Sequence, residues 1–166
     1  DTLNPGFYFV DSIGFKSISF DKSLCKEPVK ASDGKISVLL VEPNKYPKMI
    51  KIDDTLEAMQ EVVGGDIEEY MPFEDEVAII CNEEGKITGM APNRAVYEEN
   101  SREMLDIICG KFFIVYAPFE AERFQSLPPD LAEKYREKFK YPERFMRVNN
   151  EIVAVPFKPV RADKER

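Results

Sequence analysis

Hydrophobic residues recur with two different periods along the middle of the chain. Residues 36–41 form an apolar, β-branched run, and a second such run follows at residues 48–52 after a group of turn residues. This pattern predicts two strands joined as a hairpin. At residues 54–63 the period becomes that of a helix, with Asp54 as the expected N-cap, Glu57 three residues later and glycines at the end. We expect this helix to cover one face of a sheet.

Strand patterns return after this helix. The patterns at residues 67–71, 77–81 and 112–116 predict three further strands, and residues 86–88 give a weaker signal of the same kind. The polar segment 82–85 contains a glycine and is typical of a hairpin turn. Most of the connections are too short for helical crossovers, which favours antiparallel pairing of neighbouring strands.

The last third of the chain contains one more clear helical pattern. Residues 102–109 fit a short helix or a strand, residues 128–139 predict a helix that starts at two prolines, and residues 147–155 predict a last strand. Together these elements predict an α+β fold with a curved sheet that is mixed or largely antiparallel. The helix at 54–63 packs on one face of this sheet, and a C-terminal helix follows.

The first part of the chain has a different pattern. In residues 1–34, aromatic residues alternate with other residues at 7–10 and 15–20, and a polar stretch follows. We therefore divide the chain into an N-terminal extended arm or hairpin with a linker, residues 1–34, and an α+β core domain, residues 35–166. The arm either packs on the core as an added hairpin or presents an aromatic surface to a partner.

Composition narrows the class of protein. The chain has 166 residues, of which 43% are hydrophobic and 33% charged, so it is long enough for one well-packed domain. No apolar run reaches the roughly 18 residues of a membrane span, and no secretory signal is visible. The three cysteines, Cys25, Cys81 and Cys109, match neither a disulfide framework nor a metal knuckle. We expect a cytoplasmic protein with buried, inert thiols and no membrane association.

The sequence contains no histidine. Serine-histidine-aspartate and cysteine-histidine machinery, and zinc sites that use histidine, therefore cannot be built from this chain alone. Phosphate-binding loops and dinucleotide fingerprints have no match either. We expect no cofactor and no catalytic residue, although a carboxylate-based enzyme without a known motif remains an alternative.

Negative charge is concentrated in the centre of the chain. Residues 53–106 contain 16 Asp and Glu against 3 Lys and Arg, whereas the whole chain has a net charge of −8. This asymmetry favours a basic protein partner and disfavours direct nucleic-acid binding. The predicted partner-binding acidic face consists of seven residues: Glu68, Glu69, Glu74, Asp75, Glu76, Glu83 and Glu84.

Three other interpretations of the acidic face compete with partner binding. The carboxylates are suitable calcium or magnesium ligands, but the spacing of a calcium-binding loop is absent, so we predict no metal site. An imitation of the phosphates of DNA would make the protein an antirestriction-type inhibitor of a DNA-binding enzyme. The simplest interpretation is a solvated surface that keeps the domain soluble.

The segment 89–94 interrupts the acidic region. Its Asn93 and Arg94 are candidates for binding a small anionic ligand such as a nucleotide, because guanidinium groups hold phosphates and carboxylates in a bidentate manner. The alternative is structural: Pro92 and Asn93 form a turn, and Arg94 pairs with a neighbouring acid.

Several segments together resemble a known family. They are residues 36–43, 55–60, 63–65, 78–86, 92–95 and 110–115. In this order they resemble the family catalogued as domain of unknown function 3846, over about residues 36–116. The resemblance brings no catalytic residue. It implies a context, because similar domains occur in bacteria, in phages and on mobile elements, sometimes near antirestriction genes.

From these observations we expect a non-catalytic binding protein, an accessory protein of a bacterial or phage mobile element that acts through a protein partner. Binding of a small anionic ligand and mimicry of DNA are the alternatives.

Overall fold

The computed structural model describes residues 8–11, 14–17 and 34–160. The chain divides into two units, residues 1–33 and residues 34–166. In the first unit, β1 (Tyr8–Asp11) and β2 (Gly14–Ser17) pair as an antiparallel hairpin, as their alternating pattern predicts. The predicted linker, and the part of the predicted second strand after residue 17, lie outside the described residues.

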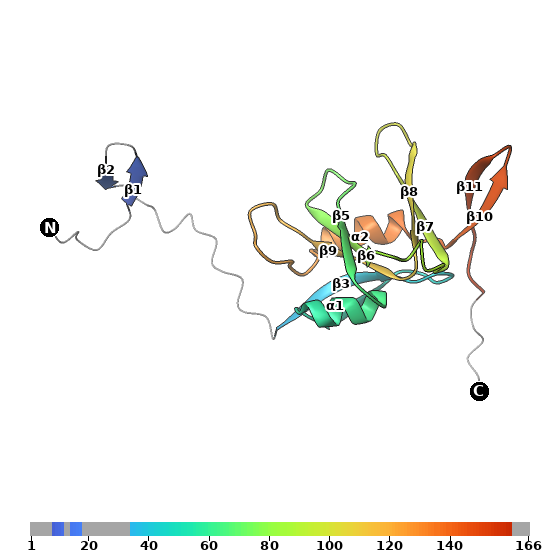
Figure 1. Ribbon diagram of the computed structural model, residues 1–166, viewed down its shortest axis with the longest axis horizontal. Coiled ribbons are helices and arrows are strands. Elements are labelled where there is room, and N and C mark those ends of the chain that lie inside the picture. Colours follow the sequence, from blue (N-terminus) through green and yellow to red (C-terminus); the bar gives the residue numbers. More distant parts are fainter. Residues whose placement is uncertain (1–7, 12–13, 18–33, 161–166) are drawn as a thin grey trace. The chain divides into compact units, whose positions relative to one another are not determined.

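The second unit is built around a five-stranded sheet (Figure 1). Its strands, in spatial order, are β4 (Lys48–Asp53), β3 (Lys35–Val41), β9 (Phe112–Tyr116), β6 (Val77–Asn82) and β5 (Ile67–Tyr70). Every neighbouring pair is antiparallel. The predicted α+β class is confirmed, and the sheet is antiparallel throughout rather than mixed.

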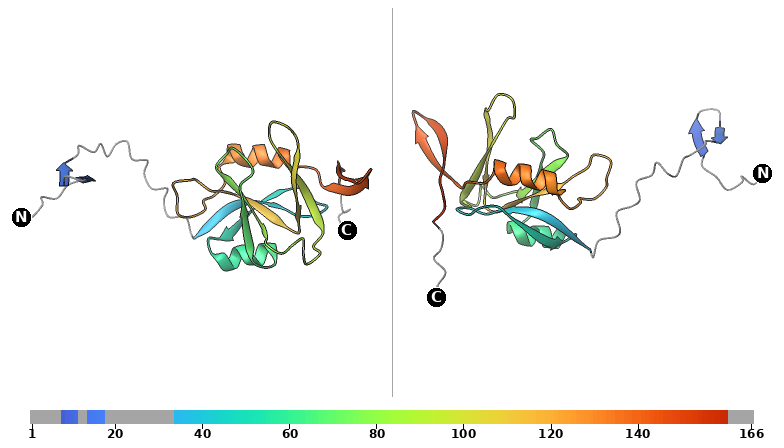
Figure 2. Two further views of the ribbon diagram at one scale, coloured as in Figure 1. Left: turned by 45° about the horizontal axis from the view of Figure 1, so that its top comes forward. Right: turned by 180° about the vertical axis from the view of Figure 1, so that it is seen from behind.

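Both faces of this sheet are buried. In the central strand β9, Phe112 and Ile114 point into one apolar core, whereas Phe113 and Val115 point into the other. A strand covered on both faces requires a continuous apolar run, which explains the sequence of β9. The helix α1 (Leu56–Val63) covers one face and α2 (Pro129–Lys138) the other, so the sheet lies between two helices (Figure 2).

The start of α1 differs by one residue from the prediction. The N-cap is Thr55, whose hydroxyl accepts a hydrogen bond from the backbone N–H of Ala58 at 3.2 Å. The carboxylate of Asp54, the predicted cap, pairs instead with Arg123. The helix ends as expected at Gly64, whose φ of 79° lies in the left-handed region that glycine adopts without strain.

A two-stranded ribbon lies on the α2 side of the sheet. It consists of β7 (Pro92–Tyr97) and β8 (Met104–Cys109), so the ambiguous segment 102–109 contains a strand rather than a helix. The predicted strand at 86–88 is wrong, because these residues belong to a turn. Residues 82–85 do turn, but they do not close a hairpin, because β6 pairs with β5 and β9 while β7 pairs with β8.

The C-terminal part ends in a second hairpin, which projects from the body of this unit (Figure 1). Its strands are β10 (Glu143–Val148) and β11 (Glu151–Pro156), where the sequence predicted one strand at residues 147–155. The difference lies in Asn149 and Asn150, whose φ angles of 49° and 65° form a tight turn between the strands. Asparagine adopts such positive φ angles more readily than most residues.

Candidate functional site

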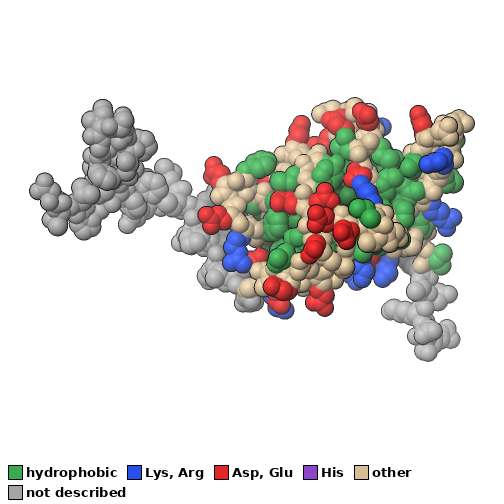
Figure 3. Space-filling model, viewed as in Figure 1, with side chains coloured by type: hydrophobic (Ala, Val, Ile, Leu, Met, Phe, Trp, Pro, Cys, Tyr) green, Lys and Arg blue, Asp and Glu red, His purple; other side chains and the backbone are tan. Residues whose placement is uncertain are grey.

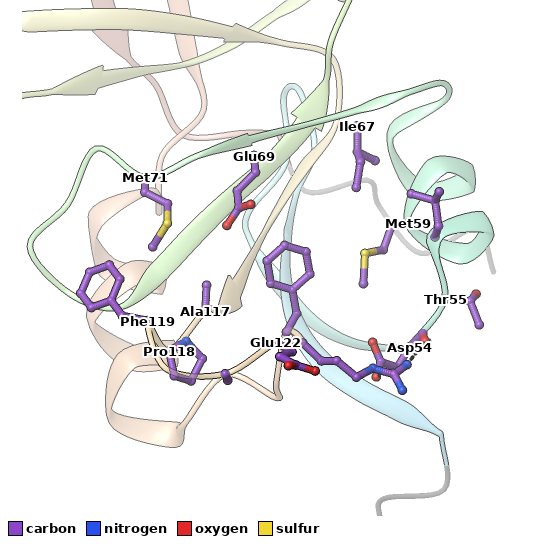
Figure 4. A pocket seen from close by; sticks show the side chains of 14 residues that line it. Asp54, Thr55, Met59, Ile67, Glu69, Met71, Ala117, Pro118, Phe119 and Glu122 are labelled. Carbon is purple, nitrogen blue, oxygen red and sulfur yellow. Dashed lines mark hydrogen bonds and ion pairs between the residues drawn. The ribbon is translucent and has the colours of Figure 1, made fainter. Parts of the chain in front are cut away.

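A large hollow lies on the α1 side of the sheet (Figure 4). We call it the α1 groove. It lies between the start of α1, the edge strand β5 and the segment 117–124, and it encloses a volume of about 520 Å³. It is lined by Asp54, Thr55, Leu56, Met59, Ile67, Glu69, Met71, Ala117, Pro118, Phe119, Ala121, Glu122, Arg123 and Phe124.

Apolar side chains form much of the α1 groove. Met59 is buried at its floor, and Figure 4 shows Met59 and Met71 directed into the hollow from opposite sides. Leu56 and Phe119 are 52% and 73% exposed. A concave surface with large exposed apolar side chains is a common feature of binding sites.

The charged groups of the α1 groove leave it negative. Arg123 pairs with the Asp54 carboxylate at 3.0 Å and donates a further hydrogen bond to the Asp54 backbone carbonyl at 3.1 Å. The opposite charges of Arg123 and Asp54 therefore cancel each other. The remaining charged residues, Glu69 and Glu122, make no ion pair among the described residues. The groove therefore favours a ligand that carries positive charge beside apolar groups.

A second hollow lies on the opposite face of β5, and we call it the β8 hollow. It encloses about 200 Å³ and is lined by Glu68, Tyr70, Cys81, Asn82, Glu83, Lys86, Ile87, Asp106, Ile108 and Cys109. Lys86 and Asp106 form an ion pair within it. Burial raises the pKa of the Cys81 thiol to about 11 and also raises the pKa of Cys109. Both thiols are thus held in the protonated form at neutral pH, which disfavours nucleophilic chemistry.

The structure divides the predicted acidic face between separate places. Glu68 and Glu83 line the β8 hollow together, whereas Glu69 lines the α1 groove, because consecutive strand residues point to opposite faces. Glu84 is exposed in the turn after β6. Figure 3 shows acidic side chains gathered near the centre of this view, where Figure 1 places β5.

The other three acids of the predicted face lie between β5 and β6. Asp75 accepts hydrogen bonds from Lys134 at 2.6 Å and from the Tyr135 hydroxyl at 2.9 Å, which attaches this segment to α2. Glu76 accepts from the backbone N–H of Phe119 at 3.0 Å and so positions one wall of the α1 groove. Glu74 is exposed. Asp75 and Glu76 thus have structural partners within the chain.

The interactions of Asp75 predict a dependence of stability on pH. The hydrogen bonds from Lys134 and Tyr135 hold the pKa of Asp75 below its ordinary value of 3.8. A lowered pKa in the folded state stabilises the fold above the unfolded pKa, and this contribution is lost as the pH falls through the lower folded pKa. Urea denaturation between neutral and strongly acidic pH should therefore show a shallower loss of stability for Asp75→Asn than for the wild type. Parallel curves for the two proteins would contradict this assignment.

Asn93 and Arg94, the candidate anion ligands, lie in the interior in strand β7 rather than in a turn. The Asn93 amide donates to the carbonyls of Val41 and Gly110 at 3.0 and 2.8 Å, and its oxygen accepts from Arg94 at 2.8 Å. Arg94 is fully buried and also donates to the carbonyls of Lys45 and Phe139, at 2.7 and 3.1 Å.

This geometry supports a structural role for the pair, which joins β7 to segments far away in the sequence. Arg94 finds backbone carbonyls where the sequence suggested a neighbouring acid. Burial lowers its pKa to about 10, and the nearby Glu143 opposes this change. Binding of an anionic ligand by Asn93 and Arg94 stays a prediction, and we do not build the proposed function on it.

The α1 groove itself was missed by the sequence interpretation. The segment 117–124 carries no strand or helix pattern, and Leu56 looked like an ordinary residue of an amphipathic helix. A usable signal was present in Phe119 and Phe124, two aromatic residues in a connection that also carries three charged residues. Among the described residues, no group of three or more Cys, Asp and Glu is arranged to hold a metal ion, and no helix is long and apolar enough to cross a membrane.

Among the comparisons with known proteins, only the one with protein families gives a match. Neither curated proteins nor solved structures give a match to this chain. A family model described as Domain of unknown function (DUF3846) matches residues 36–140, which extends beyond the expected limit near residue 116 and includes α2. The matched region holds the five-stranded sheet except Lys35, the first residue of β3, together with both helices and every residue of the α1 groove. The chain therefore belongs to the DUF3846 family.

Proposed function

We propose that this domain is a non-catalytic binding module that takes an apolar and basic segment of a partner protein into the α1 groove. One observation carries the proposal: exposed apolar side chains, Leu56 and Phe119, lie in a concave surface where the carboxylates of Glu69 and Glu122 make no ion pair with any other described residue. Apolar contact supplies affinity in such a site, and charge supplies selection of the partner.

The charge of the surrounding chain supports the same kind of partner. The segment 53–106, in which acidic residues are concentrated, includes α1 and β5. Its negative charge attracts a basic segment before the two make contact. The same field repels anions, which makes the α1 groove a poor site for a nucleotide or for nucleic acid. Mimicry of DNA receives no support from the fold, because the acids are divided between two hollows and the segment at 74–76. The role on a bacterial or phage mobile element stays a prediction.

A selection of peptides tests the proposal. A phage-displayed library of random peptides, panned on the purified protein, should become enriched in sequences that combine large apolar residues with lysine or arginine. Binding of a selected peptide, measured by fluorescence polarisation, should weaken about tenfold or more in Phe119→Ser and in Leu56→Ser, because each change removes an apolar contact of about 1.5–3 kcal/mol. Glu69→Lys should also weaken binding, and its loss of affinity should be larger at low salt than at high salt.

Two matched variants serve as controls. Val160→Ser changes a side chain that is 94% exposed and lies outside the α1 groove. Glu151→Lys reverses an exposed charge on the projecting hairpin. Both should bind the selected peptide like the wild type. Enrichment of acidic or uncharged polar peptides, or equal binding by the groove variants and the controls, would overturn the proposal.

A further inference from the structure

The outer edge of β5 is available for another strand. In the five-stranded sheet β5 is a terminal strand, and within the described part of the chain it pairs with β6 alone. The N–H of Glu83 donates to the carbonyl of Asp66 at 2.9 Å, which places this pair in a hydrogen-bonded position of the ladder. Hydrogen-bonded positions alternate along antiparallel strands. The N–H and C=O groups of Ile67 and Glu69 therefore point away from β6, toward the open edge.

The side chains of β5 line two different hollows in alternation. Ile67 and Glu69 line the α1 groove, whereas Glu68 and Tyr70 line the β8 hollow on the opposite face. A strand added beside β5 would follow the same alternation, so its successive side chains would enter the two hollows in turn. Backbone hydrogen bonds would come from the edge, and specificity from the hollows.

We propose that the partner segment binds as an added strand on the outer edge of β5, with alternate side chains in the α1 groove and in the β8 hollow. This inference rests on the proposed function and specifies its binding mode. The occupant is an extended segment in which apolar residues alternate with lysine or arginine. The apolar residues enter the α1 groove, where Met59 and Phe119 lie, and the basic residues reach Glu68 and Glu83 in the smaller hollow. The carboxylates of Glu69 and Glu122 at the α1 groove add to the attraction of the same basic segment, without a direct ion pair to it.

The charges on β5 argue against a second copy of the chain as the occupant. Pairing two copies of β5 would bring Glu68 and Glu69 of one chain beside the same residues of the other, and like charges placed together on adjacent strands oppose pairing. A basic segment reverses the sign of this interaction. The edge is thus protected against self-association and open to a partner of opposite charge.

Backbone amide exchange followed by NMR gives the most direct test. The probe is a short synthetic peptide in which valine and leucine alternate with lysine. Its control has the same composition, with the apolar residues and the lysines in separate blocks. In the free protein the amides of Ile67 and Glu69 should exchange fast, since they face the open edge, whereas those of Glu68 and Tyr70 are already protected by β6. The alternating peptide should slow exchange at Ile67 and Glu69 by about tenfold or more, and the block peptide should not.

A proline substitution tests the same contact by binding. Glu69→Pro and Glu69→Ala both remove the carboxylate, but only proline removes the outward N–H, and proline is tolerated on an edge strand where its nitrogen faces solvent. The alternating peptide should bind Glu69→Pro at least about tenfold more weakly than Glu69→Ala. If Glu69→Pro does not fold, amide exchange in the wild-type protein decides.

The outcomes separate this inference from the proposed function. If the alternating peptide binds, loses affinity in Phe119→Ser, and leaves exchange at Ile67 and Glu69 unchanged, then strand addition is overturned while binding in the α1 groove stands. If Phe119→Ser and Glu69→Pro both bind the peptide like the wild type, the proposed function and the binding mode fail together.

Discussion

Replacement of Arg94 by alanine is expected to lower the free energy of unfolding by about 3–5 kcal/mol. The side chain is fully buried and donates hydrogen bonds to three backbone carbonyls, those of Lys45, Asn93 and Phe139. Alanine removes these donors together, leaves buried acceptors without partners and creates a cavity. The measurement is urea denaturation at neutral pH, followed by circular dichroism.

Two further substitutions identify the reason for the loss. Arg94→Lys keeps the charge but replaces the planar fork of donors by one ammonium group, so it should recover only part of the stability. Arg136→Ala removes an exposed arginine from α2 and should change the free energy of unfolding by less than about 0.5 kcal/mol. A loss below about 1 kcal/mol for Arg94→Ala would show that the carbonyls find other partners and that Arg94 does not join these segments.

The case of Arg94 also shows the limit of prediction from this sequence. Its neighbourhood of proline, asparagine and arginine resembles an exposed turn, because only local residues are visible in a sequence pattern. The carbonyls that bind the side chain belong to Lys45 and Phe139, which are 49 and 45 positions away. A polar residue that is buried by distant backbone groups leaves no periodic signal, so the sequence left both an ordinary turn and a ligand-binding site open for Arg94.

The main sheet was predictable for the opposite reason. The runs that form β3, β6 and β9 are buried on both faces, and a continuous apolar run of strand length has few other stable placements. Which of these strands pair with one another was harder to predict from the sequence. Strand β6 lies between β5 and β9, so the turn that follows it does not form the predicted hairpin.

The α1 groove was beyond sequence reasoning because three separated segments form it. Residues 54–59 come from the first turn of α1 and the two residues before it, residues 67–71 from β5 and the residue after it, and residues 117–124 from a connection without regular structure. The acidic composition favours a basic partner, which stays a prediction, but it could not show that consecutive residues Glu68 and Glu69 face different hollows. Charge counts along a chain give the sign of a surface charge. Only the strand geometry shows how the charged side chains are divided between the two faces of the sheet.

The second large effect is expected at Tyr135, which joins α2 to the segment between β5 and β6. Its ring is fully buried and lies 5.1 Å from the ring of Phe73, and its hydroxyl donates to Asp75 at 2.9 Å. Burial, together with Asp75, raises the pKa of Tyr135, so the hydroxyl keeps the proton that it donates. Tyr135→Ala should lower the free energy of unfolding by about 3–5 kcal/mol. Tyr135→Phe, which keeps the ring and removes the hydrogen bond, should cost about 1–1.5 kcal/mol.

A double-mutant cycle separates the hydrogen bond from the packing of the ring. If the Tyr135 hydroxyl acts through Asp75, then Tyr135→Phe should cost clearly less in the Asp75→Asn background than in the wild type, because the charged acceptor is already gone. Tyr135→Ala should keep most of its cost in that background, since the contact with Phe73 is lost either way. Urea denaturation of the single and double variants at neutral pH gives all the required values. Equal costs of Tyr135→Phe in both backgrounds would show that the hydroxyl stabilises the fold by a route other than Asp75.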